Sequence, residues 1–208
     1  MQRTALAVLA AFLCTSALAE EAKPVDNTPK LANGLLMKQG GKLVFAPCRD
    51  RSYAIVDDVS NGSSVTEALD SIGLEAGKKL YVELIGVMED VNLKASGLNF
   101  ARADGRCQAP GGADEAWRAA GNEPGWNLVA GGSKVVLLRK GKPNVTVPFA
   151  PFKSEGNITS YEASQGVDKL ALRFEKTVCR DKAADVLLGW TATVTVNGEI
   201  LKGCAWQR

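Results

Sequence analysis

The chain has 208 residues, with 25 lysines and arginines against 23 aspartates and glutamates, and a formal net charge of +2. Its 46% hydrophobic and 23% charged residues are typical of a folded globular protein and exclude the composition of disordered chains. The near-neutral balance excludes a strongly basic protein that binds nucleic acid. The chain contains no histidine, which excludes every catalytic group or metal site that depends on imidazole.

Residues Met1–Ala19 have the features of a secretory signal peptide. Arg3 supplies the positive start, an apolar stretch runs from Ala5 to Leu13, and Ala17-Leu18-Ala19 forms an A-x-A cleavage site. The apolar stretch is shorter than the about 20 residues that a membrane-spanning helix needs, and no later segment is apolar for long enough. We therefore expect cleavage after Ala19, a periplasmic protein, and no transmembrane segment in the mature chain.

Cys14 leaves with the predicted signal peptide. Leu13 precedes it, whereas a lipid-attachment site requires a small residue there, so a lipoprotein is not expected.

Four cysteines remain after cleavage: Cys48, Cys107, Cys179 and Cys204. An even number in an oxidising compartment indicates two disulfides, and three pairings are possible. We favour Cys48–Cys107 and Cys179–Cys204, because each bond then closes within one half of the chain. No C-x-x-C pair and no histidine is present, so neither a metal site nor a cofactor is expected, and a catalytic thiol would lack a histidine base.

The first half is predicted to be an OB-like β domain with one helix, spanning 42–110 after a flexible leader at 20–41. Ser64 and Glu67 form a capping box at the start of the predicted helix, and Gly73 stands where the helix would stop. The OB analogy rests on the order of the elements alone. The predicted strands are Lys42–Cys48, Ser52–Val56, Lys79–Met88 and Leu98–Ala103, and the predicted helix is Ser64–Leu74.

The segment Gln108–Ala113 is rich in proline and glycine and is the predicted domain boundary. All four tryptophans follow it, and this change in composition supports two small domains. The second domain, 114–208, is predicted to be an antiparallel barrel or sandwich. Asn197-Gly198 is a strong hairpin signal between its last two strands. The predicted strands are Trp126–Val129, Lys134–Lys140, Asn144–Phe149, Asn157–Glu162, Lys169–Glu175, Thr191–Val196 and Glu199–Cys204.

The sequence Gly-Asn-Glu-Pro-Gly-Trp at 121–126 predicts a constrained turn that enters a strand. Pro124 fixes its own φ and favours an extended Glu123, and Gly121 and Gly125 permit positive φ. Two interpretations stay open. The turn is either a structural element pinned by Trp126, or a loop that presents Asn122 and Glu123 to a ligand or partner.

The tripeptide Cys-Arg-Asp occurs twice, at 48–50 and at 179–181. The repeat is either coincidence, local turn chemistry, or part of a site in which Arg180 and Asp181 lie beside Glu123. The candidate binding residues are Asn122, Glu123, Trp126, Arg180 and Asp181.

The run GNEPGW followed by Cys179-Arg180-Asp181 and by Gly203-Cys204 resembles a family of uncharacterised bacterial envelope proteins and lipoproteins. The likeness covers most of residues 117–204, and it departs at Gly125, where the family pattern has an aromatic residue. The resemblance implies a periplasmic location, a disulfide at Cys179, and β domains distantly like META-type stress lipoproteins and lysozyme inhibitors. It implies no enzymatic activity.

Common catalytic signatures are missing from the sequence: there is no G-x-S-x-G elbow, S-x-x-K pair, Walker loop or G-x-G-x-x-G run. The first hypothesis is therefore a non-enzymatic periplasmic protein that binds an envelope protein, a glycan or another envelope component. The second is an inhibitor of a peptidoglycan hydrolase of the lysozyme type. The third is a hydrolase whose two carboxylates assemble in space.

Overall fold

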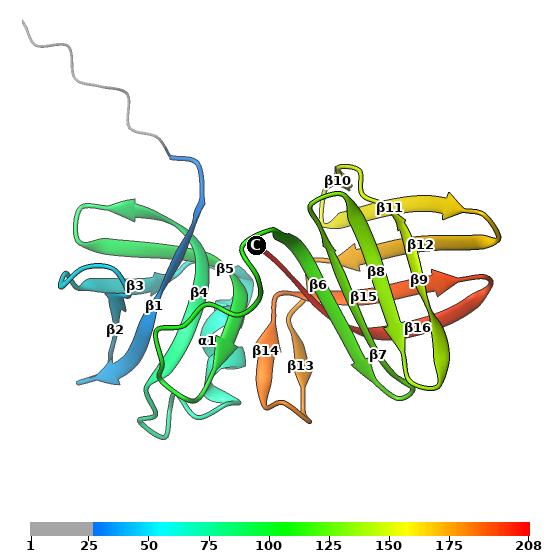
Figure 1. The fold of residues 1–208 in the computed structure, drawn as a ribbon. Coiled ribbons are helices and arrows are strands. Elements are labelled where there is room, and N and C mark those ends of the chain that lie inside the picture. Colours follow the sequence, from blue (N-terminus) through cyan, green and yellow to red (C-terminus); the bar gives the residue numbers. More distant parts are fainter. Residues whose placement is uncertain (1–26) are drawn as a thin grey trace, which may run out of the picture.

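The computed structural model describes residues 27–208, so the predicted signal peptide lies outside the described residues. The chain is mainly β, as predicted, and forms a small closed barrel beside a larger curled sheet (Figure 1). Among the described residues, no helix combines the length and the apolar character that crossing a membrane requires.

Five strands close the first barrel in the order β3-β2-β1-β4-β5, and β3 pairs in parallel with β5. This strand order, with a helix between β3 and β4, confirms the OB-like arrangement with one helix. The strands are β1 (Lys30–Gln39), β2 (Lys42–Pro47), β3 (Ala54–Asp58), β4 (Leu80–Glu89) and β5 (Asn92–Arg102).

The prediction of a flexible leader at 20–41 is wrong for its second half, because Lys30–Gln39 forms strand β1. This strand lies between β2 and β4, and Leu36 is fully buried in the barrel. Gly34 hides the strand pattern, since glycine weakens a predicted strand. A Cβ at Gly34 would overlap the ring of Phe45 and the carbonyl oxygen of Ala46, so the close approach of β1 and β2 requires glycine there.

The predicted helix is present as α1 (Ser64–Asp70), preceded by a short 3-10 turn, η1 (Asn61–Ser63). The capping box predicted from Ser64 and Glu67 is wrong, because Asp58 and Ser60 supply the cap. The Asp58 carboxylate accepts hydrogen bonds from Thr66 N at 2.7 Å and Ser60 N at 3.0 Å. The hydroxyl oxygen of Ser60 accepts one from Val65 N at 3.1 Å.

Nine strands form the second sheet, in the order β10-β11-β12-β15-β16-β6-β7-β8-β9. The sheet curls around an aromatic interior that contains Trp117, Trp126 and Trp190. Its two ends approach each other where the Tyr161 hydroxyl donates to the carbonyl oxygen of Pro148. The strands are β6 (Glu115–Asn122), β7 (Gly125–Gly131), β8 (Lys134–Arg139), β9 (Lys142–Pro148), β10 (Lys153–Glu155), β11 (Ile158–Gln165), β12 (Asp168–Glu175), β15 (Trp190–Val196) and β16 (Glu199–Gln207).

Sequence periodicity gives the inward faces of this sheet correctly. Leu170, Leu172 and Phe174 alternate along β12 and are all buried. Asn197 and Gly198 have φ of 50° and 87° and join β15 to β16, as the hairpin signal predicts.

The predicted division at 114 needs one correction, because part of the second half belongs to the first sheet. Strands β13 (Cys179–Asp181) and β14 (Val186–Leu188) form a hairpin, and β14 pairs with β5. This hairpin lies between the two bodies in Figure 1. The prediction missed both strands because each is three residues long, and because β14, the partner of β13, itself pairs with β5 far back in the sequence.

Polar and aromatic contacts join the two sheets where β16 ends against β5. The side-chain amide of Asn99 donates to the Gln207 carbonyl at 2.6 Å and accepts from Gln207 N at 3.2 Å. The same amide donates to Glu83 at 2.8 Å. Phe100 packs against Trp206 with ring centroids 6.2 Å apart. The junction is therefore a packed core and not a flexible linker.

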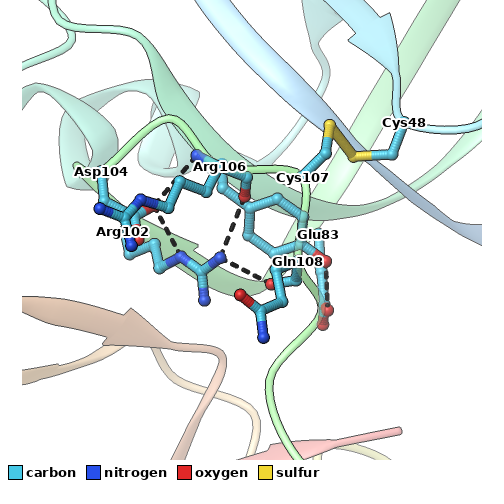
Figure 2. The surroundings of a disulfide bond; sticks show 8 residues. Cys48, Glu83, Arg102, Asp104, Arg106, Cys107 and Gln108 are labelled. Atoms are coloured by element: carbon cyan, nitrogen blue, oxygen red, sulfur yellow. Dashed lines mark hydrogen bonds and ion pairs between the residues drawn. A yellow bond between two sulfur atoms is a disulfide. The ribbon is translucent and has the colours of Figure 1, made fainter.

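Both predicted disulfides are confirmed: Cys48 is bonded to Cys107, and Cys179 to Cys204. Cys107 lies in the segment that leads from β5 to β6, and Figure 2 shows how Arg102 organises that segment. Its guanidinium donates to Asp104 at 2.7 Å and to the carbonyl oxygens of Arg106 at 3.0 Å and Gln108 at 2.7 Å. Cys179 and Cys204 join the β13–β14 hairpin to β16, so this bond connects the two sheets.

The Asp58 cap predicts a specific pH dependence of stability. Burial acts to raise the pKa of Asp58, but hydrogen bonds from Ser60 and Thr66 outweigh it and lower the pKa below 3.8. The stabilisation is therefore complete above pH 3.8 and is lost as the pH falls through the folded-state pKa. We expect Asp58→Ala to cost about 1 kcal/mol of unfolding free energy at pH 7, and the difference from the native chain to shrink in acid.

Asp57→Ala is the matched control, measured by the same urea denaturation. Asp57 makes a partly exposed ion pair with Lys94 at 2.8 Å, so its loss should cost less than about 0.5 kcal/mol. Equal costs for the two variants at pH 7 would contradict the assigned cap.

Removing each disulfide by paired Cys→Ser substitution should lower the unfolding free energy by amounts that follow loop length. The chain-entropy relation gives about 4 kcal/mol for Cys48–Cys107 and about 3.5 kcal/mol for Cys179–Cys204. Urea denaturation of each double variant, compared with the oxidised native chain, measures this. A loss below about 1 kcal/mol for either pair would show that the bond constrains little of the unfolded chain.

Candidate functional site

The GNEPGW segment forms the end of the β6–β7 hairpin. Asn122 pairs with Gly125 across this end, and Glu123 and Pro124 make the two-residue loop between them, joined by a cis peptide bond. Glu123 is exposed at the tip. The hairpin therefore presents a polar end, as the sequence predicts.

Trp126 anchors this hairpin from inside. Its side chain is only 2% exposed, and its indole nitrogen donates to the Lys202 carbonyl oxygen at 3.2 Å. Gly121 lies opposite Trp126, and neither Gly121 nor Gly125 uses the positive φ that a glycine permits. A Cβ at Gly121 would overlap the Trp126 indole and the Lys202 carbonyl oxygen, so the missing side chain makes room for the tryptophan.

The second Cys-Arg-Asp tripeptide is strand β13 itself, and the structure brings it to the GNEPGW hairpin. The side-chain amide of Asn122 donates to Asp181 Oδ1 at 2.9 Å. The same oxygen accepts from the backbone N–H groups of Ala183 at 2.9 Å and Ala184 at 3.2 Å. Asn122 and Asp181, predicted separately, therefore lie together.

The repeat of Cys-Arg-Asp has a common local explanation. Asp50 accepts from Ser52 N at 2.8 Å, and Asp181 accepts from Ala183 N at 2.9 Å. Each aspartate thus bonds the backbone two residues later, which is the geometry of an Asx turn. Hydrogen bonds from the Ser52 hydroxyl and then from its backbone lower the pKa of Asp50. The turn-chemistry interpretation accounts for both copies, and Asp181 of the second copy also lines a pocket.

A pocket of about 490 Å³ lies at this meeting point. Asn122, Asn127, Lys140 and Asp181 contribute to its wall. Asp181 Oδ2 and the Lys140 amine make no hydrogen bond or ion pair within residues 27–208. The pocket thus offers a free acceptor and a free cation, together with amide groups that donate and accept.

Ion pairs fix the far wall of the pocket. Arg139 contacts Glu199 at 3.0 Å, and the Lys142 amine lies 2.7 Å from the same carboxylate. The hydrogen bond from Lys142 lowers the pKa of Glu199, and the charge of Arg139 adds to this effect. Arg139 is therefore held in place, whereas Lys140 is free to meet a ligand.

The structure treats the five predicted binding residues differently. Asn122 and Asp181 line the pocket, and Glu123 projects from the adjacent tip without an ion pair among the described residues. Trp126 lines one edge but is buried, so it supports the hairpin more than it offers a surface. Arg180 donates to Asp185 at 2.8 Å within its own hairpin and is not part of the pocket lining.

Sequence reasoning missed Asn127 and Lys140. Residue 139 lies opposite residue 126 because Gly132 and Ser133 form the β7–β8 turn, with Gly131 opposite Lys134. The turn at Gly131-Gly132 fixes which residues of β7 and β8 lie opposite each other. Pairing residues outward from this turn would have placed Lys140 beside Gly125.

Other chemistry has little support among residues 27–208. No group of three or more cysteine, aspartate or glutamate side chains gathers there to hold a metal ion. Burial raises the pKa of Glu83, but its carboxylate oxygens accept hydrogen bonds from Tyr81 at 2.9 Å and Asn99 at 2.8 Å in the core. Glu155 and Glu162 both line another pocket, of about 460 Å³, on the second sheet.

Comparison with protein-family models, with curated proteins and with solved structures finds no match for this chain. The resemblance to envelope proteins therefore stays a prediction from the sequence.

The two glycines of the motif provide a matched test of its structural part. We expect Gly121→Ala to lower the unfolding free energy by about 2 kcal/mol, because its methyl group overlaps buried atoms. Gly125→Ala should change it by less than about 0.5 kcal/mol, because a Cβ there meets no atom closer than 3.9 Å. Thermal or urea denaturation measures both, and equal effects would contradict the close packing of Gly121 against Trp126.

Proposed function

We propose that this chain is a non-enzymatic periplasmic protein that binds an envelope component or a protein partner through the pocket at the ends of the β6–β7 and β13–β14 hairpins. The hydrogen bond between Asn122 and Asp181 carries the proposal. It joins two segments that the sequence separates by 59 residues, and it does so at the rim of a pocket with unpaired polar groups.

The pocket suits recognition better than catalysis. Its lining contains one carboxylate, Asp181, so the pair of carboxylates that glycoside hydrolysis uses is not available within the lining. Asp181 accepts three hydrogen bonds at one oxygen, which fixes the other oxygen as an acceptor for a ligand. Groups held in place lose little entropy on binding, and this preorganisation favours affinity.

The two disulfides support an oxidising location. Disulfides persist in exported proteins and are rare in reducing compartments. Together with the sequence features of Met1–Ala19, they favour a periplasmic site of action.

Site-specific crosslinking in the periplasm tests the proposal. A photo-crosslinking phenylalanine analogue in place of Glu123 should form an adduct with an envelope component. The same analogue in place of Val167, which is 90% exposed on the β11–β12 turn, is the control and should not. Lys140→Gln should reduce the adduct at position 123, and equal adducts at 123 and 167 would contradict the assigned surface.

Inhibition of a peptidoglycan hydrolase is the second candidate function. The exposed Glu123 at the end of a tight hairpin favours it, because lysozymes are cationic and an anionic tip would be attracted electrostatically. A lytic assay with purified protein at micromolar concentration separates the two functions. Undiminished lysozyme activity would end the inhibitor hypothesis and leave the binding proposal standing.

A further inference from the structure

A second hollow lies between the two sheets, and it shares no residue with the pocket at the hairpin ends. It has a volume of about 550 Å³, within the range of about 300–1,000 Å³ of small-molecule sites. One wall comes from η1 and α1 of the first barrel. The other comes from the β10–β11 turn and from residues 176–178, which follow β12.

The lining of this inter-sheet hollow is rich in groups that form hydrogen bonds. Asn61, Asn157 and Thr177 are exposed and make no side-chain hydrogen bond within residues 27–208. Their amides and hydroxyl can both donate and accept, which matches the hydroxyl groups of a sugar. Three further hydroxyls in the lining are already hydrogen-bonded: that of Ser60 donates to Asp58, that of Ser64 to Ser60, and that of Ser96 to the Ile85 carbonyl oxygen.

The lining carries a single charge, that of Lys176. The Lys176 amine makes no ion pair or hydrogen bond in the part of the chain that the structure describes, and no aspartate or glutamate is among the lining residues. An unpaired cation without a competing carboxylate favours a ligand that carries an anionic group.

The floor of the hollow is rigid. Gly189 donates its backbone N–H to the Asn99 carbonyl oxygen at 2.7 Å. A Cβ on Gly189 would overlap the Leu98 carbonyl oxygen, so the two sheets are in backbone contact there. Gly97 leaves room above this floor, and a Cβ at Gly97 would meet Lys176 Cε at 3.6 Å. The walls are thus held at a fixed separation before any ligand arrives.

We propose that the inter-sheet hollow binds a small sugar that carries one anionic group, with Lys176 contacting the anionic group and Asn61, Asn157 and Thr177 contacting the hydroxyls. The proposal goes beyond the binding function of the hairpin-end pocket and does not depend on it. The anionic group can be a carboxylate or a phosphate, and the experiment separates these sources.

Titration followed by NMR tests the proposal with four probes: glucuronate, glucose 6-phosphate, glucose and acetate. Each is added to the folded native chain up to about 10 mM, which detects dissociation constants in the millimolar range. We expect one or both charged sugars to shift the side-chain amide signals of Asn61 and Asn157. Glucose lacks the charge and acetate lacks the hydroxyls, so both should bind at least about tenfold more weakly.

Variants identify the site. Lys176→Gln should weaken binding of the charged sugar by at least about tenfold, as expected for the loss of one charge-assisted hydrogen bond. Gly97→Val should block it by filling the hollow, and Lys134→Gln, an exposed lysine on β8, is the matched control. Unfolding midpoints close to that of the native chain show that each variant is folded.

Three results would overturn the proposal. One is the absence of shifts with either charged sugar. Another is an equal response to acetate, which would show a non-specific charge effect. The third is a set of shifts confined to Asn122 and Asn127, which would move the sugar to the hairpin-end pocket and leave the proposed function intact.

Discussion

Strand β5 of the first sheet contacts two later segments, the end of β16 and the residue between β14 and β15, and these contacts hold the two sheets together. The Asn99 side chain bonds both backbone groups of Gln207, and the backbone of Gly189 lies against Leu98 and Asn99. The chain therefore crosses between the sheets three times, after β5, before β13 and after β14, and the end of β16 packs against β5. A junction crossed once can act as a hinge, whereas three crossings with a packed aromatic pair leave little freedom for the sheets to move apart.

This junction also explains why the two hollows are found where they are. Asp181 belongs to the first sheet and Asn122 to the second, so their hydrogen bond forms only when the sheets are docked. The disulfide from Cys179 to Cys204 begins two residues before Asp181 and keeps β13 against β16. The inter-sheet hollow likewise takes its walls from both sheets. The buried hydrogen bonds of Asn99 and the Cys179–Cys204 disulfide thus bring together the polar groups that line the two hollows. Local structure alone would leave these groups apart.

The sequence predicts those features that depend on neighbours along the chain. Alternation gives the inward faces of strands such as Lys169–Glu175, and Asn197-Gly198 gives the last hairpin. The disulfide pairing is predicted correctly by keeping each bond within one half of the chain, although the Cys179–Cys204 bond in fact connects the two sheets. Prediction of a strand fails where the conformation of a residue depends on contact with a residue far away in the sequence. Residue 34 must be glycine because a Cβ there would overlap the carbonyl oxygen of Ala46 on the next strand. Leu188 is part of a strand because it pairs with Phe100 of β5.

The same distinction between local and distant contacts applies to the residues of the candidate site. Asn122 and Asp181 can be selected from their motifs, but nothing in the sequence states that they touch, because their contact depends on the β13–β14 hairpin joining the first sheet. The sequence makes Arg180 as good a candidate for the binding site as Asp181. In the structure Arg180 instead donates a hydrogen bond to Asp185 within its own hairpin. Trp126 is a candidate binding residue because of its large side chain. The same size explains its burial, because a large indole stabilises a hairpin best when it is removed from water.

The distribution of satisfied and unsatisfied polar groups favours the proposal that this chain binds a ligand. Glu83, whose pKa burial raises, has both oxygens bonded inside the core and cannot meet a substrate without breaking the junction. Lys140 and Lys176, by contrast, are unpaired in the described part of the chain and stand at the walls of hollows. A group that is both perturbed and exposed in a cleft is typical of catalysis. Glu83, whose pKa burial raises, is enclosed, while hydrogen bonds lower the pKa values of Asp50, Asp58 and Glu199. The unpaired groups at the walls of the two hollows are cations and amides on a rigid support, and this arrangement favours the proposal that they hold a ligand.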